Sequence, residues 1–194
     1  MCNILYDSNA KKSFNIYYGK EPDLRKIELK DGMENIEDSL TNRSCTDHLK
    51  IHTKAFQLDN IKRKLPCIFD GVNPARRKVL CGSIKKFTSS KIETKVFQLS
   101  GYIAELMSYH HGSASLEKTI INMAQDYIGA NNIPLLLPLS QFGSRFAGGK
   151  DCGAPRYIKT TLNKKLVDVL FKREDDYVLD YNQDEGQINE PIYY

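Results

Sequence analysis

Three amphipathic helical segments, two short strand-like segments and a long glycine-rich loop between those strands predict an α+β fold for this chain of 194 residues. A hydrophobic content of 41% is enough for a globular core, and no apolar run is long enough to span a bilayer. The first residues lack the order of basic, apolar and small residues that is typical of a signal peptide. We therefore expect a soluble, intracellular protein with no membrane partner.

The first predicted helix covers residues 73–87, NPARRKVLCGSIKKF. Asn73 is a good N-cap, and Pro74 suits the first helical position because its missing N–H would be unpaired there in any case. The apolar positions share one face and are Leu80, Ile84 and Phe87. Lys78 and Lys85 fall on the opposite face.

Two further helices are predicted at residues 95–109 and 116–127. The apolar face of the second helix consists of Val96, Leu99, Ile103 and Leu106. The apolar face of the third consists of Leu116, Ile120, Met123 and Tyr127. Lys118 faces away from that stripe, together with Asn122 and Gln125, so this face suits either a groove of DNA or water.

Two strand-like segments follow the third helix. Residues 133–140, IPLLLPLS, are an apolar run bounded by prolines, and residues 156–162 read RYIKTTL. The loop between them, residues 141–155, is rich in glycine. Three helices followed by such a hairpin are typical of a winged-helix unit, a helix-turn-helix variant whose third helix enters the major groove. The loop is then the wing, and its basic side chains would lie on phosphates.

Charge is strongly segregated along the chain, although the formal net charge is only +4. Residues 60–96 contain ten Lys or Arg and two acidic residues, whereas residues 174–194 contain seven acidic residues and no Lys or Arg. The basic segment favours a polyanionic partner, and with the winged-helix order it predicts double-stranded DNA; a merely solvated face is the alternative. The residues expected to contact DNA are Arg76, Lys78, Lys85, Lys118, Arg145 and Lys150.

The five cysteines form no CxxC pair and no regular framework, which favours reduced thiols over disulfides. Cys45, His48 and His52 have the spacing of metal ligands, but no fourth ligand is evident near them. We therefore expect no metal site in this chain.

Four motifs resemble the DNA breakage and reunion region of type IIA DNA topoisomerases, in the branch of eukaryotes and large DNA viruses. They are DGVNPARRKVL at 70–80, YHHG at 109–112, QFGSR at 141–145 and GGKDCGAPRY at 148–157. Each motif is weak alone, but the four follow one another in the order of the family. The chain departs from the family at Cys152, Gly153 and Pro155, where alanines are usual. Pro155 fixes its own φ and favours an extended residue before it, so we expect this loop to differ in detail from that of the family.

The same resemblance suggests how the chain is organised. Residues 1–55 are similar to the end of the preceding TOPRIM-side region with a linker, since YYGKEPDLRKIELK resembles the last TOPRIM helix. Residues 56–171 correspond to the winged-helix cleavage domain. Residues 172–194 form the acidic segment that leads to the next domain, the tower. INEPIYY resembles the point in the family where that next domain begins. The chain is thus expected to be part of a much larger enzyme.

The resemblance implies that Tyr157 is a nucleophile. Its phenolic oxygen would attack a backbone phosphorus and form a 5′-phosphotyrosyl bond while a 3′-hydroxyl leaves, and this ester conserves the energy needed for resealing. Arg156 and Arg77 would stabilise the developing phosphorane through forked hydrogen bonds. His111 would donate to a phosphate oxygen or assist with the proton, and His110 is interpreted as structural.

Cofactors and further partners are also implied by the resemblance. None is expected in this chain, because Mg²⁺ and ATP would bind elsewhere in the complete enzyme, which hydrolyses ATP to pass one duplex through another. The expected partners are double-stranded DNA, the TOPRIM domain of the same polypeptide and a second copy in a homodimer. The isolated chain should bind DNA weakly and cut nothing. The expected location is the nucleus, or the host cytoplasm or viral factory for a viral enzyme.

Two other interpretations remain open at the level of the residues. The chain is a non-enzymatic winged-helix DNA-binding domain if Tyr157 is only a strand residue, or a structural domain whose basic face meets an acidic partner. A buried Tyr157 hydroxyl would favour these alternatives. An exposed hydroxyl near Arg156, Arg77 and His111 would favour the topoisomerase.

Overall fold

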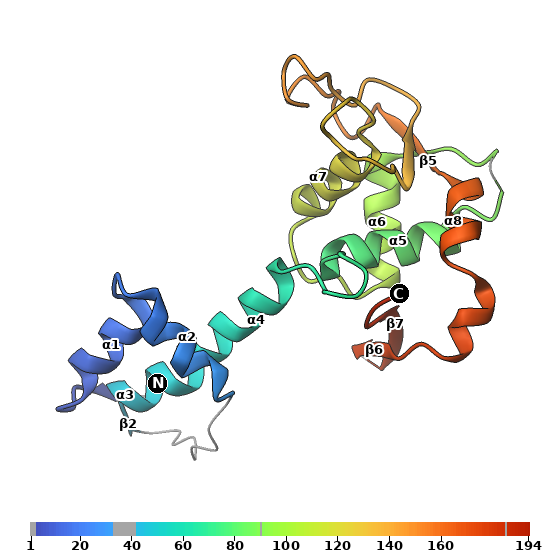
Figure 1. The fold of residues 1–194 in the computed structure, drawn as a ribbon. Helices are drawn as coiled ribbons and strands as arrows, with labels where there is room; N and C mark the ends of the chain where they lie inside the picture. Colours follow the sequence, from blue (N-terminus) through green and yellow to red (C-terminus); the bar gives the residue numbers. More distant parts are fainter. Residues whose placement is uncertain (1–2, 33–41, 90, 185) are drawn as a thin grey trace. The chain divides into compact units, whose positions relative to one another are not determined.

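The computed structural model describes residues 3–32, 42–89, 91–184 and 186–194. The chain divides into two compact units, Met1–Leu65 and Pro66–Tyr194, and each is treated separately below (Figure 1). None of the helices in the described ranges is long and apolar enough to cross a membrane.

The first unit combines a two-stranded parallel sheet with short helices. Strand β1 (Asn3–Leu5) pairs with β2 (Asn42–Ser44). The helices are α1 (Ala10–Tyr18), α2 (Pro22–Lys30), α3 (Cys45–His48), the π-helical turn η1 (Leu49–Thr53) and α4 (Lys54–Lys64). Lys54 is buried, and its Nζ lies 3.5 Å from a Glu28 carboxylate oxygen that also accepts a hydrogen bond from Tyr17. Of residues 1–55, predicted to be the end of a TOPRIM-side region with a linker, residues 33–41 lie outside the described ranges.

The three predicted helices are present in the second unit. They are α5 (Pro74–Lys86), α6 (Val96–Leu106) and α7 (Ser113–Ala124). Asn73 caps α5 as predicted, because its side-chain oxygen accepts a hydrogen bond from the Arg76 N–H at 2.9 Å. Helix α7 lies nearer the N-terminus than predicted: it ends before Gln125, whose backbone is extended and whose side chain turns to the wing.

A three-stranded antiparallel sheet follows the helices, in the order β3 (Thr94–Lys95), β5 (Lys159–Leu162), β4 (Leu136–Pro138). The hairpin of β4 and β5 was predicted, whereas β3 was not, since two residues carry no periodic signal. The second strand was expected to begin at residue 156 but begins at Lys159. Pro155 has no N–H for a sheet ladder, and residues 154–158 instead form a turn.

The core of the second unit lies between α5, α6, α7 and the sheet (Figure 1). Its fully buried side chains include Leu80, Leu99, Ile103, Leu116, Ile120 and Leu136. Gly82 of α5 lies so close to Ile103 of α6 that a Cβ at this glycine would be 2.8 Å from the Ile103 side chain. Three packed helices followed by a small sheet with a long loop form the predicted winged helix.

The acidic C-terminal segment is folded as part of the second unit. It follows α8 (Lys164–Leu170) and contains the 3₁₀ turn η2 (Arg173–Tyr177) and an antiparallel hairpin of β6 (Tyr181–Asp184) and β7 (Gln187–Pro191). The hairpin packs on α5, where Lys78 forms an ion pair with Glu190 at 2.9 Å. Its role as the approach to a further domain stays a prediction.

Candidate functional site

Arg156 and Tyr157 stand together on a turn whose backbone is fixed. The N–H of Tyr157 donates to the Ala154 carbonyl at 2.9 Å. The turn is tied to the start of α6, because Val96 N–H donates to the Ile158 carbonyl and Phe97 N–H to the Pro155 carbonyl, at 3.0 and 3.1 Å. Ile158 is buried, whereas the Tyr157 side chain is 72% exposed and Arg156 is exposed. The phenol therefore projects into solvent from an anchored backbone.

This turn also lies beside the N-terminus of an 11-residue helix, α6. The first N–H groups of a helix carry partial positive charge and favour anions nearby. The first two of these groups, the N–H of Val96 and of Phe97, already donate to the turn, so Arg156 is the cationic neighbour that a phosphate brought to Tyr157 would meet. The geometry suits an anionic substrate.

The glycines of the wing, residues 141–155, allow backbone segments to approach one another closely. Gly143 has a φ of +100°, and a Cβ there would lie 2.6 Å from the Gly149 Cα. A Cβ at Gly149, where φ is +79°, would lie 2.4 Å from the Gln125 side-chain nitrogen. The glycine-rich sequence therefore shapes a compact wing that packs against the end of α7.

Hydrogen bonds hold the wing in one conformation. Gly149 N–H donates to the Ser144 carbonyl at 2.9 Å, and the Gln125 side chain donates to the Phe142 carbonyl at 2.9 Å. Asp151 accepts a hydrogen bond from the Ser144 N–H at 2.8 Å, and this bond is the largest cause of the lowered pKa of the Asp151 carboxyl.

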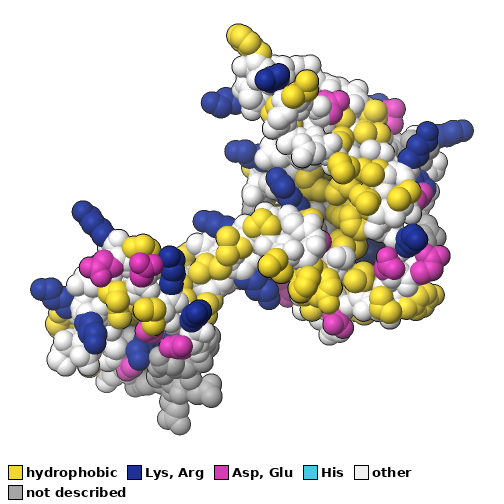
Figure 2. Space-filling view, in the orientation of Figure 1, with side chains coloured by type: hydrophobic (Ala, Val, Ile, Leu, Met, Phe, Trp, Pro, Cys, Tyr) yellow, Lys and Arg dark blue, Asp and Glu magenta, His cyan; other side chains and the backbone are white. Residues whose placement is uncertain are grey.

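The predicted DNA-contacting residues of the wing and of α7 are at the surface. Arg145, Lys150 and Lys118 are exposed, as are Arg76 and Lys85 on α5. Figure 2 shows dark blue Lys and Arg side chains projecting from this unit. These five side chains remain candidates for phosphate contacts.

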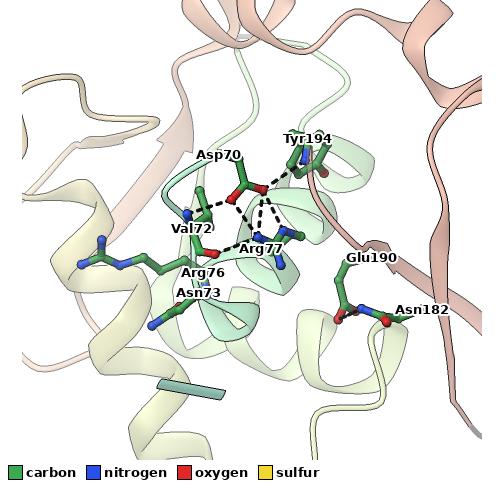
Figure 3. Close-up of polar contacts among 8 residues, drawn as sticks. All are labelled: Asp70, Val72, Asn73, Arg76, Arg77, Asn182, Glu190 and Tyr194. Atoms are coloured by element: carbon green, nitrogen blue, oxygen red, sulfur yellow. Dashed lines mark hydrogen bonds and ion pairs between the residues drawn. The ribbon is translucent and has the colours of Figure 1, made fainter. Parts of the chain in front are cut away.

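Arg77 is buried, and the expectation that it lies on an exposed surface with Tyr157 is wrong. Its side chain is 4% exposed, and it forks onto the Asp70 carboxylate with Nε–Oδ2 at 3.0 Å and Nη2–Oδ1 at 2.8 Å (Figure 3). Nη2 also donates to the Val72 carbonyl at 2.7 Å. Figure 3 shows Arg76 directed away from this pair. Two nitrogens of the Arg77 guanidinium, Nε and Nη2, are thus engaged inside the protein.

Lys78 is likewise turned inward rather than toward a phosphate. Its side chain is 16% exposed, its Nζ lies 2.9 Å from the buried Glu190 carboxylate, and it donates to the Met107 carbonyl. The expected phosphate contact of Lys78 is therefore not available in this conformation, because Glu190 already compensates its charge.

His111 is exposed just before α7, with its ring edge-to-face against Tyr109 at 5.3 Å. It follows the C-terminal end of α6, whereas the Tyr157 turn is bonded to the N-terminal end. Eleven residues of α-helix span about 16 Å. His110, interpreted as structural, lies 3.0 Å from the Asp184 carboxylate. Of the four expected catalytic residues, Arg156 and Tyr157 are neighbours on one turn, Arg77 is buried against Asp70, and His111 follows the other end of α6.

Sequence reasoning missed the residues that hold this architecture. Asp70 binds Arg77, the Val72 N–H and the Tyr194 N–H, and Glu190 binds Asn182 (Figure 3). Glu190 also forms the ion pair with Lys78. The only signal for Asp70 was its place in the DGVNPARRKVL motif. The partner residues near position 190 lie too far along the chain for any local pattern.

No group of three or more His, Cys, Asp or Glu side chains in the described ranges is placed to hold a metal ion. The side chains beside Tyr157 do not form the carboxylate set that Mg²⁺ requires. No chemical step at this turn is therefore assigned to a metal held by these residues.

Comparison with known proteins shows the family. The family model for the A subunit of DNA gyrase/topoisomerase IV matches residues 63–194. The chain is 43% identical over 196 residues to DNA topoisomerase 2 of African swine fever virus, covering 97% of this chain and 16% of the relative. It is 47% identical over 139 residues to DNA topoisomerase 2 of Arabidopsis thaliana, covering 72% of this chain and 9% of that protein.

The structural comparison agrees. The crystal structure of the Plasmodium falciparum topoisomerase II DNA-binding, cleavage and re-ligation domain is similar with a TM-score of 0.82 and 39% identity. The similarity covers 98% of this chain and 26% of that one. The chain belongs to the family of the DNA gyrase/topoisomerase IV A subunit. Its viral and eukaryotic relatives named DNA topoisomerase 2 confirm the predicted resemblance to type IIA DNA topoisomerases. It spans only a small part, 16% or less, of these curated relatives.

Proposed function

We propose that this chain is the DNA-binding and cleavage segment of a type II DNA topoisomerase, with Tyr157 as the nucleophile. The observation that carries the proposal is the exposed phenol of Tyr157 on an anchored turn beside Arg156, in a chain of this family. A phenol that served only to pack a strand would be buried. The exposure therefore favours the enzyme over a purely structural winged helix.

The proposed step is a transesterification. The Tyr157 oxygen attacks a backbone phosphorus, its proton leaves the phenol, and the bond from phosphorus to the 3′-oxygen breaks as that oxygen takes up a proton. Arg156 donates hydrogen bonds to the non-bridging oxygens as charge develops on them. The reverse attack by the 3′-hydroxyl reseals the strand and frees Tyr157.

We propose different roles for the two other residues. Arg77 is buried and bound to Asp70, so we propose that it is a positioning residue that fixes the start of α5 and reaches a phosphate only if that pair opens. His111 follows the C-terminal end of α6, whereas the Tyr157 turn is bonded to the N-terminal end, so we place His111 on a different phosphate of the bound duplex.

The partners and cofactors of the complete enzyme belong to this proposal as well. Double-stranded DNA is the substrate, and Mg²⁺ and ATP bind to other parts of the enzyme, including a TOPRIM domain. The enzyme acts as a homodimer that hydrolyses ATP and passes one DNA duplex through another. It works in the nucleus, or in the host cytoplasm or viral factory if its source is a virus.

The test is Tyr157→Phe in a complete enzyme, for example the African swine fever virus relative with its matched segment replaced by this chain. With supercoiled plasmid, ATP and Mg²⁺, both relaxation and trapped protein-linked DNA should disappear, while DNA affinity stays unchanged because only one oxygen is lost. Tyr177→Phe is the matched control, since Tyr177 is 91% exposed and lies in η2. A covalent adduct that persists in the Tyr157→Phe enzyme would refute the assignment.

A further inference from the structure

The aromatic ring of Phe146 is completely exposed to solvent. Its side chain is 103% exposed, more than any other large hydrophobic side chain in the described part of the chain. Its neighbours do not form an apolar patch with it, because Phe142 is buried and Ala147 is small and half-buried. A single exposed ring does not make the apolar patch that marks a protein–protein interface, so its use depends on the groups around it.

The turn that carries Phe146 is rigid. Besides the Gly149–Ser144 bond, Gly148 N–H donates to the Arg145 carbonyl and Lys150 N–H to the Ala147 carbonyl, both at 3.2 Å. The turn is bound to the end of α7, since the Gln125 side chain contacts the Gly149 carbonyl at 3.5 Å. The exposed ring is thus presented on a preorganised support, which lowers the entropy lost when it is buried.

The surroundings of the ring are positive. Arg145 and Lys150 are exposed at the two sides of the turn, and the nearby exposed Asp151 carboxylate accepts a hydrogen bond from the Ser144 N–H. An apolar ring flanked by two cationic side chains is complementary to a base step, because the stacked bases are apolar and lie between phosphates.

We propose that Phe146 is a wedge that inserts at a base step of bound duplex DNA, while Arg145 and Lys150 contact the flanking phosphates. Apolar side chains that enter between base pairs unstack them and kink the duplex. The inference rests on the proposed DNA substrate but not on the identity of the nucleophile. It adds a residue that deforms DNA near the turn that bears Tyr157.

The experiment uses the 194-residue chain and a set of duplexes that carry 2-aminopurine at successive positions. Unstacking raises the fluorescence of this base. Binding of the wild-type chain should raise the signal, and Phe146→Ala should abolish the rise and weaken affinity roughly tenfold, within the range of base–aromatic stacking. The slope of affinity against salt should stay unchanged, because the phosphate contacts remain. Phe146→Trp should retain the signal.

Phe56→Ala is the matched control, since Phe56 is 62% exposed on α4 in the other unit, and it should behave as wild type. The wedge is refuted if the wild-type chain binds without a fluorescence change, or if Phe146→Ala binds and unstacks DNA like wild type. It is also refuted if Phe146→Ala changes only the association of protein chains, because the ring would then dock on protein. Tyr157→Phe should keep the signal, so failure of the nucleophile and failure of the wedge are separate results.

Discussion

Asp70 and Arg77 form a buried, forked ion pair that closes the loop before α5, with both side chains 5% exposed or less. The same carboxylate accepts hydrogen bonds from the Val72 N–H at 2.9 Å and from the Tyr194 N–H at 3.0 Å. One side chain thus joins the start of the winged helix to the last residue of the chain. An arginine of the family motif is here part of the framework that supports the site.

Asp70→Asn should destabilise the second unit strongly, because it leaves the Arg77 charge buried without its partner. The expected loss is about 3–5 kcal/mol of unfolding free energy. Urea unfolding of the 194-residue chain followed by circular dichroism measures it. Asp168→Asn is the control, since it removes an exposed pair with Lys164 and should cost about 0.5 kcal/mol or less. Equal costs for the two variants would contradict the framework role.

Lys78→Glu and Lys85→Glu should separate folding from DNA binding. The Lys78 change places a second carboxylate against buried Glu190, so it should reduce stability by several kcal/mol, on the order of a broken buried pair. The Lys85 change is at the surface, so it should leave stability intact while weakening DNA affinity and lowering the salt slope by about one unit. Urea unfolding and DNA titration at several salt concentrations give the two readings. The account fails if Lys78→Glu folds normally and only binding suffers.

The hydrogen bond from the Ser144 N–H to the Asp151 carboxylate, which holds the wing, should weaken in acid. The pKa of Asp151 is lowered from 3.8 chiefly by the hydrogen bond from the Ser144 N–H and then by the Ser144 hydroxyl. A lowered folded-state pKa means that the contribution is complete above the unfolded value near 3.8 and is lost as pH falls through the lower folded value. A carboxyl titration by NMR should give a midpoint below 3.8, and Ser144→Ala should raise it. A midpoint at or above 3.8 in the wild-type chain would contradict this.

Local patterns predicted much of this fold, and the residues show why. Two neighbouring residues, Asn73 and Pro74, marked the start of α5. Helical spacing alone predicted the apolar stripe of α7 from Leu116 to Met123. The exposed Arg156–Tyr157 pair came from a local motif as well. The predictions that were wrong concerned residues whose partners lie far away along the chain.

The burial of Arg77 and Lys78 could not be predicted, because it depends on residues far along the chain. Both follow an N-cap in a basic run, and nothing local distinguishes them from exposed Arg76. Their burial depends on Glu190 and Tyr194, which are more than a hundred positions away and approach only once the hairpin of β6 and β7 has packed on α5. Sequence spacing cannot show which member of a basic run will meet such a partner.

Arg156→Ala should slow strand cleavage without removing it, which separates this residue from Tyr157. The nucleophile remains, but one donor to the developing charge is lost, and such a loss typically costs about 3 kcal/mol of transition-state stabilisation. Single-turnover cleavage at saturating DNA in the complete enzyme should therefore slow by roughly a hundredfold, while Arg156→Lys, which keeps the charge but not the fork, should lie between. If Arg156→Ala weakened DNA binding yet cleaved at the wild-type rate once saturated, Arg156 would position the phosphate in the ground state only. The charge that develops at the attacked phosphate would then have to be stabilised by groups other than the neighbour of Tyr157.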